Sequence, residues 1–214
     1  MIMMRLRCFL FLAMAQSVVA VGQETVSVRI GTQVWQAQNL NTEKFRNGDP
    51  IREIRDAQAW LDAGHDRLPA WSHYDNQSSS GILYGKLYNW YAVSDPRGLC
   101  PEGWHVATKA DWDTLIEYLG GEKTAAIRLK HPDSWALRKK SRGDNSSGFA
   151  ALPGGYRYHN GGFENLEFDG YWWTSTEHDH YYAWLCDMVY SSGTVYRYFN
   201  LKDKGMAVRC VQDE

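Results

Sequence analysis

Residues 98–112 read GLCPEGWHVATKADW and contain the clearest change of secondary structure in the chain. The run Trp104–Ala107 has the character of a short strand, and Thr108 then stands at the N-cap position of a helix, with Asp111 three residues later. This spacing is that of a capping box, with Asp in place of the longer Glu. One apolar stripe follows, made of Trp112, Leu115, Ile116 and Leu119. The stretch therefore predicts a strand that leads into an amphipathic helix, which ends at Gly120–Gly121.

Towards the N-terminus the pattern indicates a β-hairpin and then a helix. Apolar residues alternate over Val26–Ile30, Gly31–Thr32 breaks the run, and a second extended run covers Gln33–Leu40. Two such runs around a short glycine turn are typical of a hairpin. Arg55–Ala63 predicts a short helix. Gly64–Gly85 is polar and irregular, so we expect a long exposed loop there.

The rest of the chain is helical first and extended later. Lys86–Val93 fits a strand and a helix equally well, whereas Glu122–Lys130 predicts a second clear helix before Pro132. The late extended runs are Phe149–Leu152, Tyr171–Thr174, Tyr182–Tyr190, Thr194–Asn200 and Met206–Val211. This order predicts an α+β class with two main helices and long loops, in a single domain over residues 23–214.

The first 22 residues have the pattern of a signal peptide. Arg5 and Arg7 precede the apolar run Cys8–Ala20, and small residues follow at its exit. We therefore expect a leader over residues 1–22 and a secreted, periplasmic or cell-surface protein. A buried N-terminal helix is the alternative. Cys8 stands at the front of the apolar run, so it does not read as a lipoprotein cysteine, and nothing later is apolar enough to span a membrane.

Charge and composition exclude some partners. The chain has 23 basic and 25 acidic residues, and loss of Arg5 and Arg7 with the leader makes it more acidic still. This balance argues against a nucleic-acid binder and against a polybasic membrane anchor. The unusual feature is aromatic, with 10 Trp, 13 Tyr and 7 Phe. Such rings fill cores, and they also form exposed platforms for sugars and peptides.

Three cysteines remain after the expected cleavage: Cys100, Cys186 and Cys210. In an oxidising compartment an odd number indicates one disulfide and one spare thiol. All three pairings are open on this ground, and three reduced thiols are the alternative for a cytosolic protein. A Cys100–Cys210 bridge would close the longest loop, for which the chain-entropy model gives about 4.7 kcal/mol of stabilisation.

Several blocks along the chain carry a family resemblance. Besides residues 98–112 they are IGTQVWQAQNL at 30–40, YGKLYNWYAV at 84–93, GFAALPGGYR at 148–157, YWWTSTE at 171–177 and GMAVRCV at 205–211. Together they resemble the Fibrobacter succinogenes major paralogous domain family. The resemblance implies a secreted or surface protein of the Bacteroidetes and Fibrobacter relatives. It implies no activity, because that family has no established common one.

A looser resemblance implies the fold. A strand that feeds a Trp-containing helix, followed by a Gly-rich β region and a closing strand with a cysteine, is similar to the C-type-lectin-like fold. This fold has mixed and antiparallel sheets, and lectins and formylglycine-generating enzymes share it. The resemblance implies a disulfide between Cys100 and Cys210, which leaves Cys186 unpaired. A shared fold does not imply a shared function.

Most motifs for specific chemistry are absent. Neither the Glu-Pro-Asn or Gln-Pro-Asp triplet nor the Trp-Asn-Asp motif of calcium-binding lectins occurs, so a structural calcium stays open without a visible site and the cofactor is unknown. A lone Cys186 argues against formylglycine-generating activity, and the hydrolase motifs Gly-x-Ser-x-Gly and His-Glu-x-x-His are missing. His178 and His180 would face one side of a strand and could share a metal, although a polar loop between strands is favoured.

The aromatic residues divide into an expected core and an expected surface. Trp104, Trp112 and Trp173 lie in strand or helix runs and should be buried. Six others lie in irregular or Gly-rich segments or at element ends, and we expect them to be exposed: Trp71, Tyr74, Tyr156, Tyr158, Tyr181 and Tyr182. Exposed Trp and Tyr stack on sugar rings. The alternative is that these six cover a small, loop-rich core.

These observations favour a non-enzymatic binding module for glycans or another extracellular polymer. A structural or adhesion protein with an aromatic contact face is the first alternative. An extracellular enzyme is the second, with dispersed carboxylates or the pair His178 and His180 as its catalytic groups, since paired carboxylates need not be close in sequence.

Overall fold

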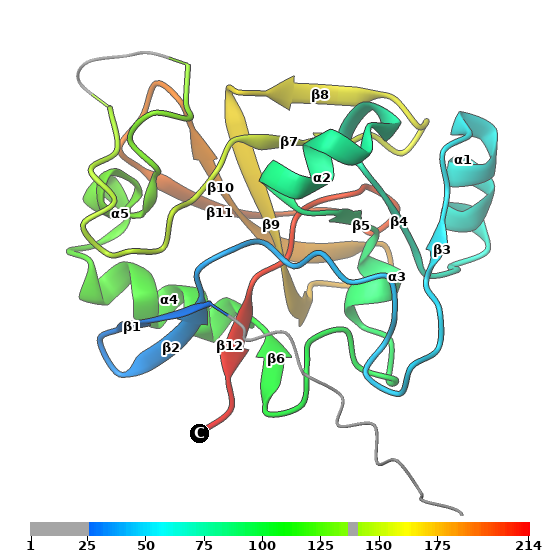
Figure 1. The fold of residues 1–214 in the computed structure, drawn as a ribbon, viewed down its shortest axis with the longest axis horizontal. Coiled ribbons are helices and arrows are strands. Elements are labelled where there is room, and N and C mark those ends of the chain that lie inside the picture. Colours follow the sequence, from blue (N-terminus) through cyan, green and yellow to red (C-terminus); the bar gives the residue numbers. More distant parts are fainter. Residues whose placement is uncertain (1–25, 137–140) are drawn as a thin grey trace, which may run out of the picture.

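The computed structural model describes residues 26–136 and 141–214. The expected leader over residues 1–22 and Cys8 lie outside these ranges. Figure 1 shows a mixed α+β arrangement in which a twisted central sheet is flanked by helices, with smaller sheets beside it. Within the described part no helix is both long and apolar enough to cross a bilayer.

The described helices and strands follow one another in mixed order. The helices are α1 (Ala57–His65), α2 (Ser78–Tyr84), α3 (Trp90–Val93), α4 (Lys109–Tyr118), α5 (Glu122–Leu129) and the 3-10 turn η1 (Tyr74–Asn76). The first strands are β1 (Ser27–Ile30), β2 (Gln33–Gln36), β3 (Arg52–Glu53), β4 (Ala70–Ser72), β5 (Leu87–Tyr88) and β6 (Trp104–Val106). The later strands are β7 (Gly154–Arg157), β8 (Phe163–Leu166), β9 (Asp169–Glu177), β10 (Tyr182–Val189), β11 (Val195–Leu201) and β12 (Cys210–Gln212).

The predicted strand and helix at residues 104–119 form as β6 and α4. Thr108 Oγ1 accepts from the Asp111 amide at 3.1 Å, and Asp111 Oδ2 accepts from the Thr108 amide at 2.8 Å. The capping box is therefore complete despite the shorter Asp. Gly120 and Gly121, both at positive φ, then turn the chain into α5. The prediction of two main helices was incomplete, because α1 is as long as α5 to within one residue.

The first sheet joins the two ends of the described chain, in the order β1-β2-β12-β6. Gly31, at φ 62°, makes the turn of the predicted β1–β2 hairpin. The second strand ends at Gln36 instead of Leu40, because the chain turns inward there. Asn39 Oδ1 accepts from Trp172 Nε1 and from Arg209 Nε, both at 2.8 Å.

The central sheet has the order β11-β10-β9-β7-β8, and β11 is one of its edges. A short turn around residues 191–193 joins β10 to β11, which pair antiparallel from Tyr182 and Leu201 to Met188 and Val195. Helices α4 and α5 cover one face of this sheet (Figure 1). That core contains Trp35, Trp112, Leu115, Ile116, Leu129, Phe149, Trp172, Cys186 and Met188, among others.

A second core lies between the other face of the sheet and the segments around β4, β5 and α3. It contains Trp71, Tyr88, Trp90, Leu99, Cys100, Trp173, Leu185, Met206, Val208 and Cys210, among others. Trp112 and Trp173 are fully buried, as predicted, whereas Trp104 is half-buried against this core. Two cores on the two faces of one sheet account for much of the aromatic content.

The prediction of a long exposed loop over Gly64–Gly85 was wrong. This segment contains β4, η1 and α2, and β4 is the middle strand of a sheet ordered β3-β4-β5. Trp71 donates to the Ile51 carbonyl at 2.9 Å and is buried, and Tyr74 is buried against Phe163. Neither ring is therefore exposed as expected. Their polar neighbours in sequence concealed a strand of only three residues.

Two shorter segments also differ from the sequence pattern. Lys86–Val93 uses both of its expected conformations, because β5 is followed after one residue by α3, whose N-cap Asn89 accepts from the Ala92 amide. Phe149–Leu152 makes no regular strand and contributes a single bridge between Ala151 and Lys130. The carbonyls of Phe149 and Ala150 instead accept hydrogen bonds from Arg209.

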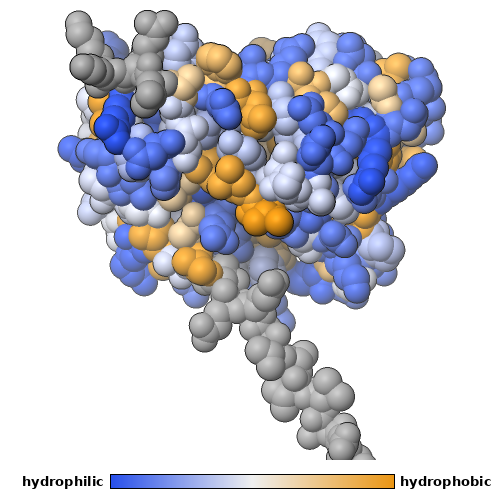
Figure 2. Space-filling model, turned by 45° about the horizontal axis from the view of Figure 1, so that its top comes forward, coloured by the Kyte–Doolittle hydropathy of each residue, from blue (hydrophilic) through white to orange (hydrophobic). Residues whose placement is uncertain are grey.

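Helix α2 lies on the surface with two apolar side chains towards solvent. Ile82 is 86% exposed and Leu83 is 56% exposed. Figure 2 shows hydrophobic residues in a broken band across one face, with hydrophilic residues on both sides. Exposed aliphatic residues of this kind are common on soluble proteins.

Arg209 is the central polar residue of the interior. Its guanidinium is buried and donates to the carbonyls of Gln36 and Phe149 at 2.7 Å and to Ala150 at 3.3 Å, besides Asn39. It also lies 4.2 Å from the Phe149 ring centre. No carboxylate among the described residues forms an ion pair with it, so the buried charge is solvated by dipoles alone.

Cys100 and Cys210 form the expected disulfide, with Cα atoms 6.0 Å apart. It links the segment before β6 to β12 over 110 residues of sequence. Cys186 is free and buried on β10. The pairing implied by the fold resemblance is therefore confirmed.

Reduction of the disulfide should destabilise the protein by about 2–5 kcal/mol, because the unfolded chain regains the freedom of a long loop. Urea unfolding of the oxidised protein and of a Cys100→Ala/Cys210→Ala variant measures the difference. Cys186→Ala, which keeps the bridge, is the control. Equal unfolding free energies for the oxidised protein and the double variant would contradict the expectation.

Substitution of Arg209 by Ala should cost more than about 3 kcal/mol, because it leaves several buried acceptors without a donor. The measurement is the free energy of unfolding in urea. Arg128→Ala is the matched control, since Arg128 is exposed on α5, and it should change stability by less than about 0.5 kcal/mol. A similar loss in both variants would show that the Arg209 contacts are not special.

Candidate functional site

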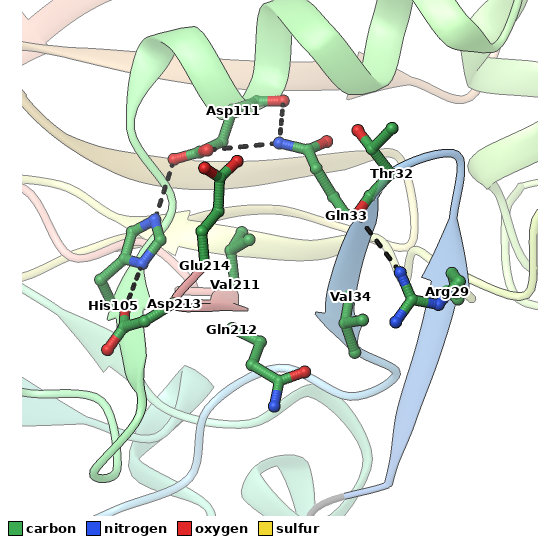
Figure 3. A pocket seen from close by; sticks show the side chains of 10 residues that line it. All are labelled: Arg29, Thr32, Gln33, Val34, His105, Asp111, Val211, Gln212, Asp213 and Glu214. Atoms are coloured by element: carbon green, nitrogen blue, oxygen red, sulfur yellow. Dashed lines mark hydrogen bonds and ion pairs between the residues drawn. The ribbon is translucent and has the colours of Figure 1, made fainter.

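A pocket of about 300 Å³ lies where β1, β2, β6 and the C-terminal residues meet. Figure 3 shows His105 on β6 between two carboxylates, Asp111 at the start of α4 and Asp213 beyond β12. His105 Nδ1 lies 2.7 Å from Asp213 Oδ1, and Nε2 lies 3.1 Å from Asp111 Oδ2. Gln33 Nε2 donates to Asp111 at 3.2 Å. Arg29 lies on the opposite wall.

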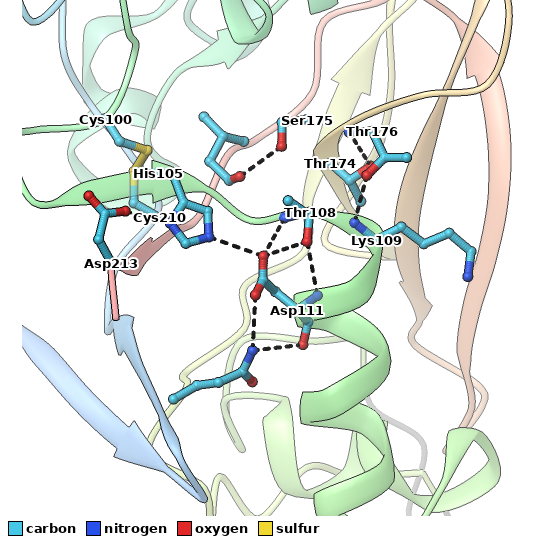
Figure 4. A network of polar contacts seen from close by, with 12 residues as sticks. Cys100, His105, Thr108, Lys109, Asp111, Thr174, Ser175, Thr176, Cys210 and Asp213 are labelled. Carbon is cyan, nitrogen blue, oxygen red and sulfur yellow. Dashed lines mark hydrogen bonds and ion pairs between the residues drawn. A yellow bond between two sulfur atoms is a disulfide. The ribbon is translucent and has the colours of Figure 1, made fainter.

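Four polar side chains of this pocket, Gln33, His105, Asp111 and Asp213, are hydrogen-bonded to one another. Asp111 already serves the capping box with Thr108, and Figure 4 shows this network directly beside the Cys100–Cys210 disulfide. Burial opposes charge on the imidazole, but hydrogen bonds to Asp213 and Asp111 outweigh it and raise the pKa of His105. We interpret the group as a clamp that holds the C-terminal strand to β6 and α4.

His178 and His180 do not lie on a strand. They occupy the loop between β9 and β10, so the shared face that the metal hypothesis requires is not formed. His178 stacks on Phe199, whereas His180 contacts Arg67 across the loop. Within the described ranges no three His, Cys, Asp or Glu side chains are grouped to hold a metal ion.

His178 instead belongs to a cluster of four rings, which we call the ring cluster: His178, Tyr182, Trp184 and Phe199. The His178 and Phe199 rings are parallel within 9° with centres 3.9 Å apart. Trp184 lies edge-on to both, at 5.4 Å from His178 and 5.8 Å from Phe199, and Tyr182 lies 5.6 Å from Phe199. Phe199 is 44% exposed, so the cluster reaches solvent.

The sheet register brings these rings together. Trp184 on β10 is directly opposite Phe199 on β11, and Tyr182 is two residues before Trp184 on the same face. Lys202 is hydrogen-bonded to the neighbouring 178–181 loop. Its buried ammonium donates to the carbonyls of Asp179 and His180 at 2.6 Å and 3.1 Å and pairs with Glu177.

Charged side chains border the ring cluster on the side of α4. Lys109 Nζ lies 5.3 Å from the Trp184 ring centre and 2.7 Å from Asp113. Arg197 pairs with Asp113 and with Glu122 at 3.0 Å. Rings with a hydrogen-bonding rim can contact both the apolar face and the hydroxyl groups of a sugar.

A second cavity, of about 210 Å³, is lined by Tyr181 of the 178–181 loop and by residues at the ends of α1 and β11. Its lining includes Tyr91, Tyr181, Arg67 and Asp203, and Tyr181 is 63% exposed. Asp203 Oδ1 is buried without a hydrogen-bond partner among the described residues, and burial raises the pKa of this carboxyl. The cavity therefore combines two rings with an unused acceptor.

A third cavity, of about 80 Å³, lies on the opposite face of β11 from the ring cluster, and we call it the Lys204 pocket. Its lining is Tyr156, Tyr171, Tyr198, Asn200, Lys204 and Met206. The Lys204 ammonium lies 5.1 Å from the Tyr156 ring centre and 4.6 Å from that of Tyr158. Tyr198 donates to Asp187 at 3.0 Å behind the pocket.

The six rings expected at the surface thus have different fates. Tyr181 is exposed, Tyr156, Tyr158 and Tyr182 are half-buried, and Trp71 and Tyr74 are buried. Sequence reasoning missed Trp184 and Phe199, because both lie inside strong strand runs that also supply the core. Their only signal was the alternation of their strands, in which Tyr182 precedes Trp184 by two residues and Arg197 precedes Phe199 by two residues.

The family comparison agrees with the sequence blocks. A model described as the Fibrobacter succinogenes major domain matches residues 28–212. This range covers nearly all of the described structure. No curated protein and no solved structure matches the chain.

The His105 clamp should make stability depend on pH. The pKa of His105 is higher in the folded protein than its ordinary value of 6.5, so the charged imidazolium stabilises the fold at pH values below 6.5. This stabilisation is lost as the pH rises through the pKa of the folded state. The difference in unfolding free energy between wild type and His105→Gln should therefore be larger near pH 5.5 than near pH 9, by about 1 kcal/mol or less, since the pair is partly exposed. Urea titrations at both pH values measure it. A difference that does not change with pH would disprove the charged clamp.

Proposed function

The chain belongs to the Fibrobacter succinogenes major domain family, and we propose that it is a non-enzymatic module that binds glycans or related extracellular polymers. The ring cluster of His178, Tyr182, Trp184 and Phe199 supports this most directly. It combines a preformed, solvent-facing set of rings with a charged rim. Because cross-strand pairing holds the rings in place, little side-chain entropy would be lost on binding.

The same proposal includes the location and the finer fold. The leader pattern at residues 1–22 supports export to the periplasm, the cell surface or the medium. The Cys100–Cys210 disulfide fits an oxidising compartment. A strand and helix closed by a disulfide to the last strand support a C-type-lectin-like fold.

The polar groups of the His105 pocket and of the ring cluster support a binding function rather than a catalytic one. In the His105 pocket the imidazole is bound to Asp111 and Asp213, and Thr108 is used in the helix cap. The ring cluster has no nucleophile and no pair of free carboxylates within it. Recognition of a ligand surface needs neither.

Phe199→Ala and Trp184→Ala should each weaken glycan binding about tenfold, because each removes a ring face and about 1–2 kcal/mol of contact energy. A glycan array, with calcium and with chelator, would first identify binders, and calorimetric titration would then give Kd for each variant. Tyr196→Ala is the matched control: Tyr196 is 42% exposed on the same strand but lies outside the ring cluster. The proposal fails if wild type binds no glycan, or if all three variants bind equally.

A further inference from the structure

Lys204 has a largely buried side chain whose ammonium has no counter-ion among the described residues. The residue is only 8% exposed, yet its ammonium makes no hydrogen bond and no ion pair with any described residue. Its contacts are with the rings of Tyr156 and Tyr158. The other buried lysines have acceptors. Lys86 donates to Asn41, Lys130 donates to the carbonyls of Val189 and Ser192, and Lys202 pairs with Glu177. Three donor hydrogens of Lys204 are thus unused at the edge of a cavity.

The neighbouring polar groups leave a place for an acceptor. The Tyr156 hydroxyl donates to Glu164, and the Tyr198 hydroxyl donates to Asp187. Asn200 Oδ1 accepts from the Leu201 amide at 2.9 Å, and its amide group has no partner within the described part of the chain. The donors that remain for a ligand in the pocket are therefore Lys204 and Asn200.

The acidic residues near the pocket do not neutralise Lys204. Asp203 and Glu164 act on it only from beyond ion-pair distance, and burial lowers the pKa of its ammonium. Behind the tyrosines, burial raises the pKa of Asp187 to about 7 and raises that of Asp169. Carboxyls in such surroundings carry less negative charge near neutral pH, so they repel an anion less.

The size of the cavity limits the group that fits. About 80 Å³ accommodates a few water molecules or one carboxylate but not a whole sugar ring. A carboxylate is planar and offers two acceptor oxygens, one for an ammonium and one for an amide. The tyrosine rings that line the pocket can contact the sugar ring to which the carboxylate is attached.

We propose that the Lys204 pocket binds the carboxylate of an acidic sugar, such as a uronic acid residue of an extracellular polysaccharide. The class of ligand rests on the proposed glycan-binding function, whereas the charge preference rests on Lys204 and Asn200. The pocket is separate from the ring cluster, because Tyr198 and Asn200 point to the opposite face of β11 from Phe199.

The test compares charge on the protein with charge on the ligand. Wild type and Lys204→Met are titrated calorimetrically with galacturonate oligomers, glucuronate-containing oligomers, and the same oligomers as neutral methyl esters. Wild type should bind the acidic form about tenfold more tightly than the ester, and Lys204→Met should bind both forms equally weakly. Lys44→Met, at an exposed lysine, should behave as wild type.

Each outcome decides the proposal. Thermal unfolding first checks that Lys204→Met is folded; Met should be tolerated, because it removes an unpaired charge and keeps the long chain. If no uronate binds wild type, or if Lys204→Met keeps the preference for the acid, the assignment is wrong. Binding of a glutamate oligopeptide without uronate binding would also overturn it. Neutral glycans that bind through Phe199 without any acid preference would leave the proposed function standing and remove only this inference.

Discussion

The arrangement of the structure depends on the hydrogen bonds of the buried Arg209 guanidinium. A positive charge in a protein interior must be surrounded by acceptors, and here these come from Gln36, Asn39, Phe149 and Ala150. Segments that are more than 100 residues apart in sequence therefore have to meet at one point. The next residue, Cys210, adds a covalent link to the same place.

This constraint positions the surfaces that we assign to binding. The segment that contains Arg209 also forms bridges to β5, β7 and β9, through Met206, Gly205 and Ala207. It thereby holds the central sheet against its two cores. The β10–β11 hairpin forms one edge of this sheet, with the ring cluster on one face and the Lys204 pocket on the other. Rigid placement of rings and a cation reduces the entropy lost when a ligand binds.

Local signals predicted the local elements well. The capping box at Thr108 and the glycines at 120–121 placed α4, and alternation with a glycine turn placed the β1–β2 hairpin, because these patterns depend on hydrogen bonds between near neighbours. The pairing of Cys100 with Cys210 was inferred from the fold resemblance, since spacing alone left three choices. The prediction of an exposed loop over residues 64–85 was wrong because the three residues of β4 form a strand only by pairing with β3 and β5.

The sequence by itself determined the family, the α+β class, the helix at residues 109–118 and an excess of rings that any fold would have to place. Only the tertiary structure decided which rings reach solvent. Trp71 is buried although it lies in a polar, irregular stretch of sequence, and Phe199 is exposed although it lies in a strand. Likewise, nothing in the sequence around Lys204 distinguishes it from Lys202. Yet Lys202 has carboxylate and carbonyl partners, whereas Lys204 has neither among the residues that the structure describes. Exposure and charge pairing are set by atoms that are distant along the chain, so they exist only after the sheet has formed.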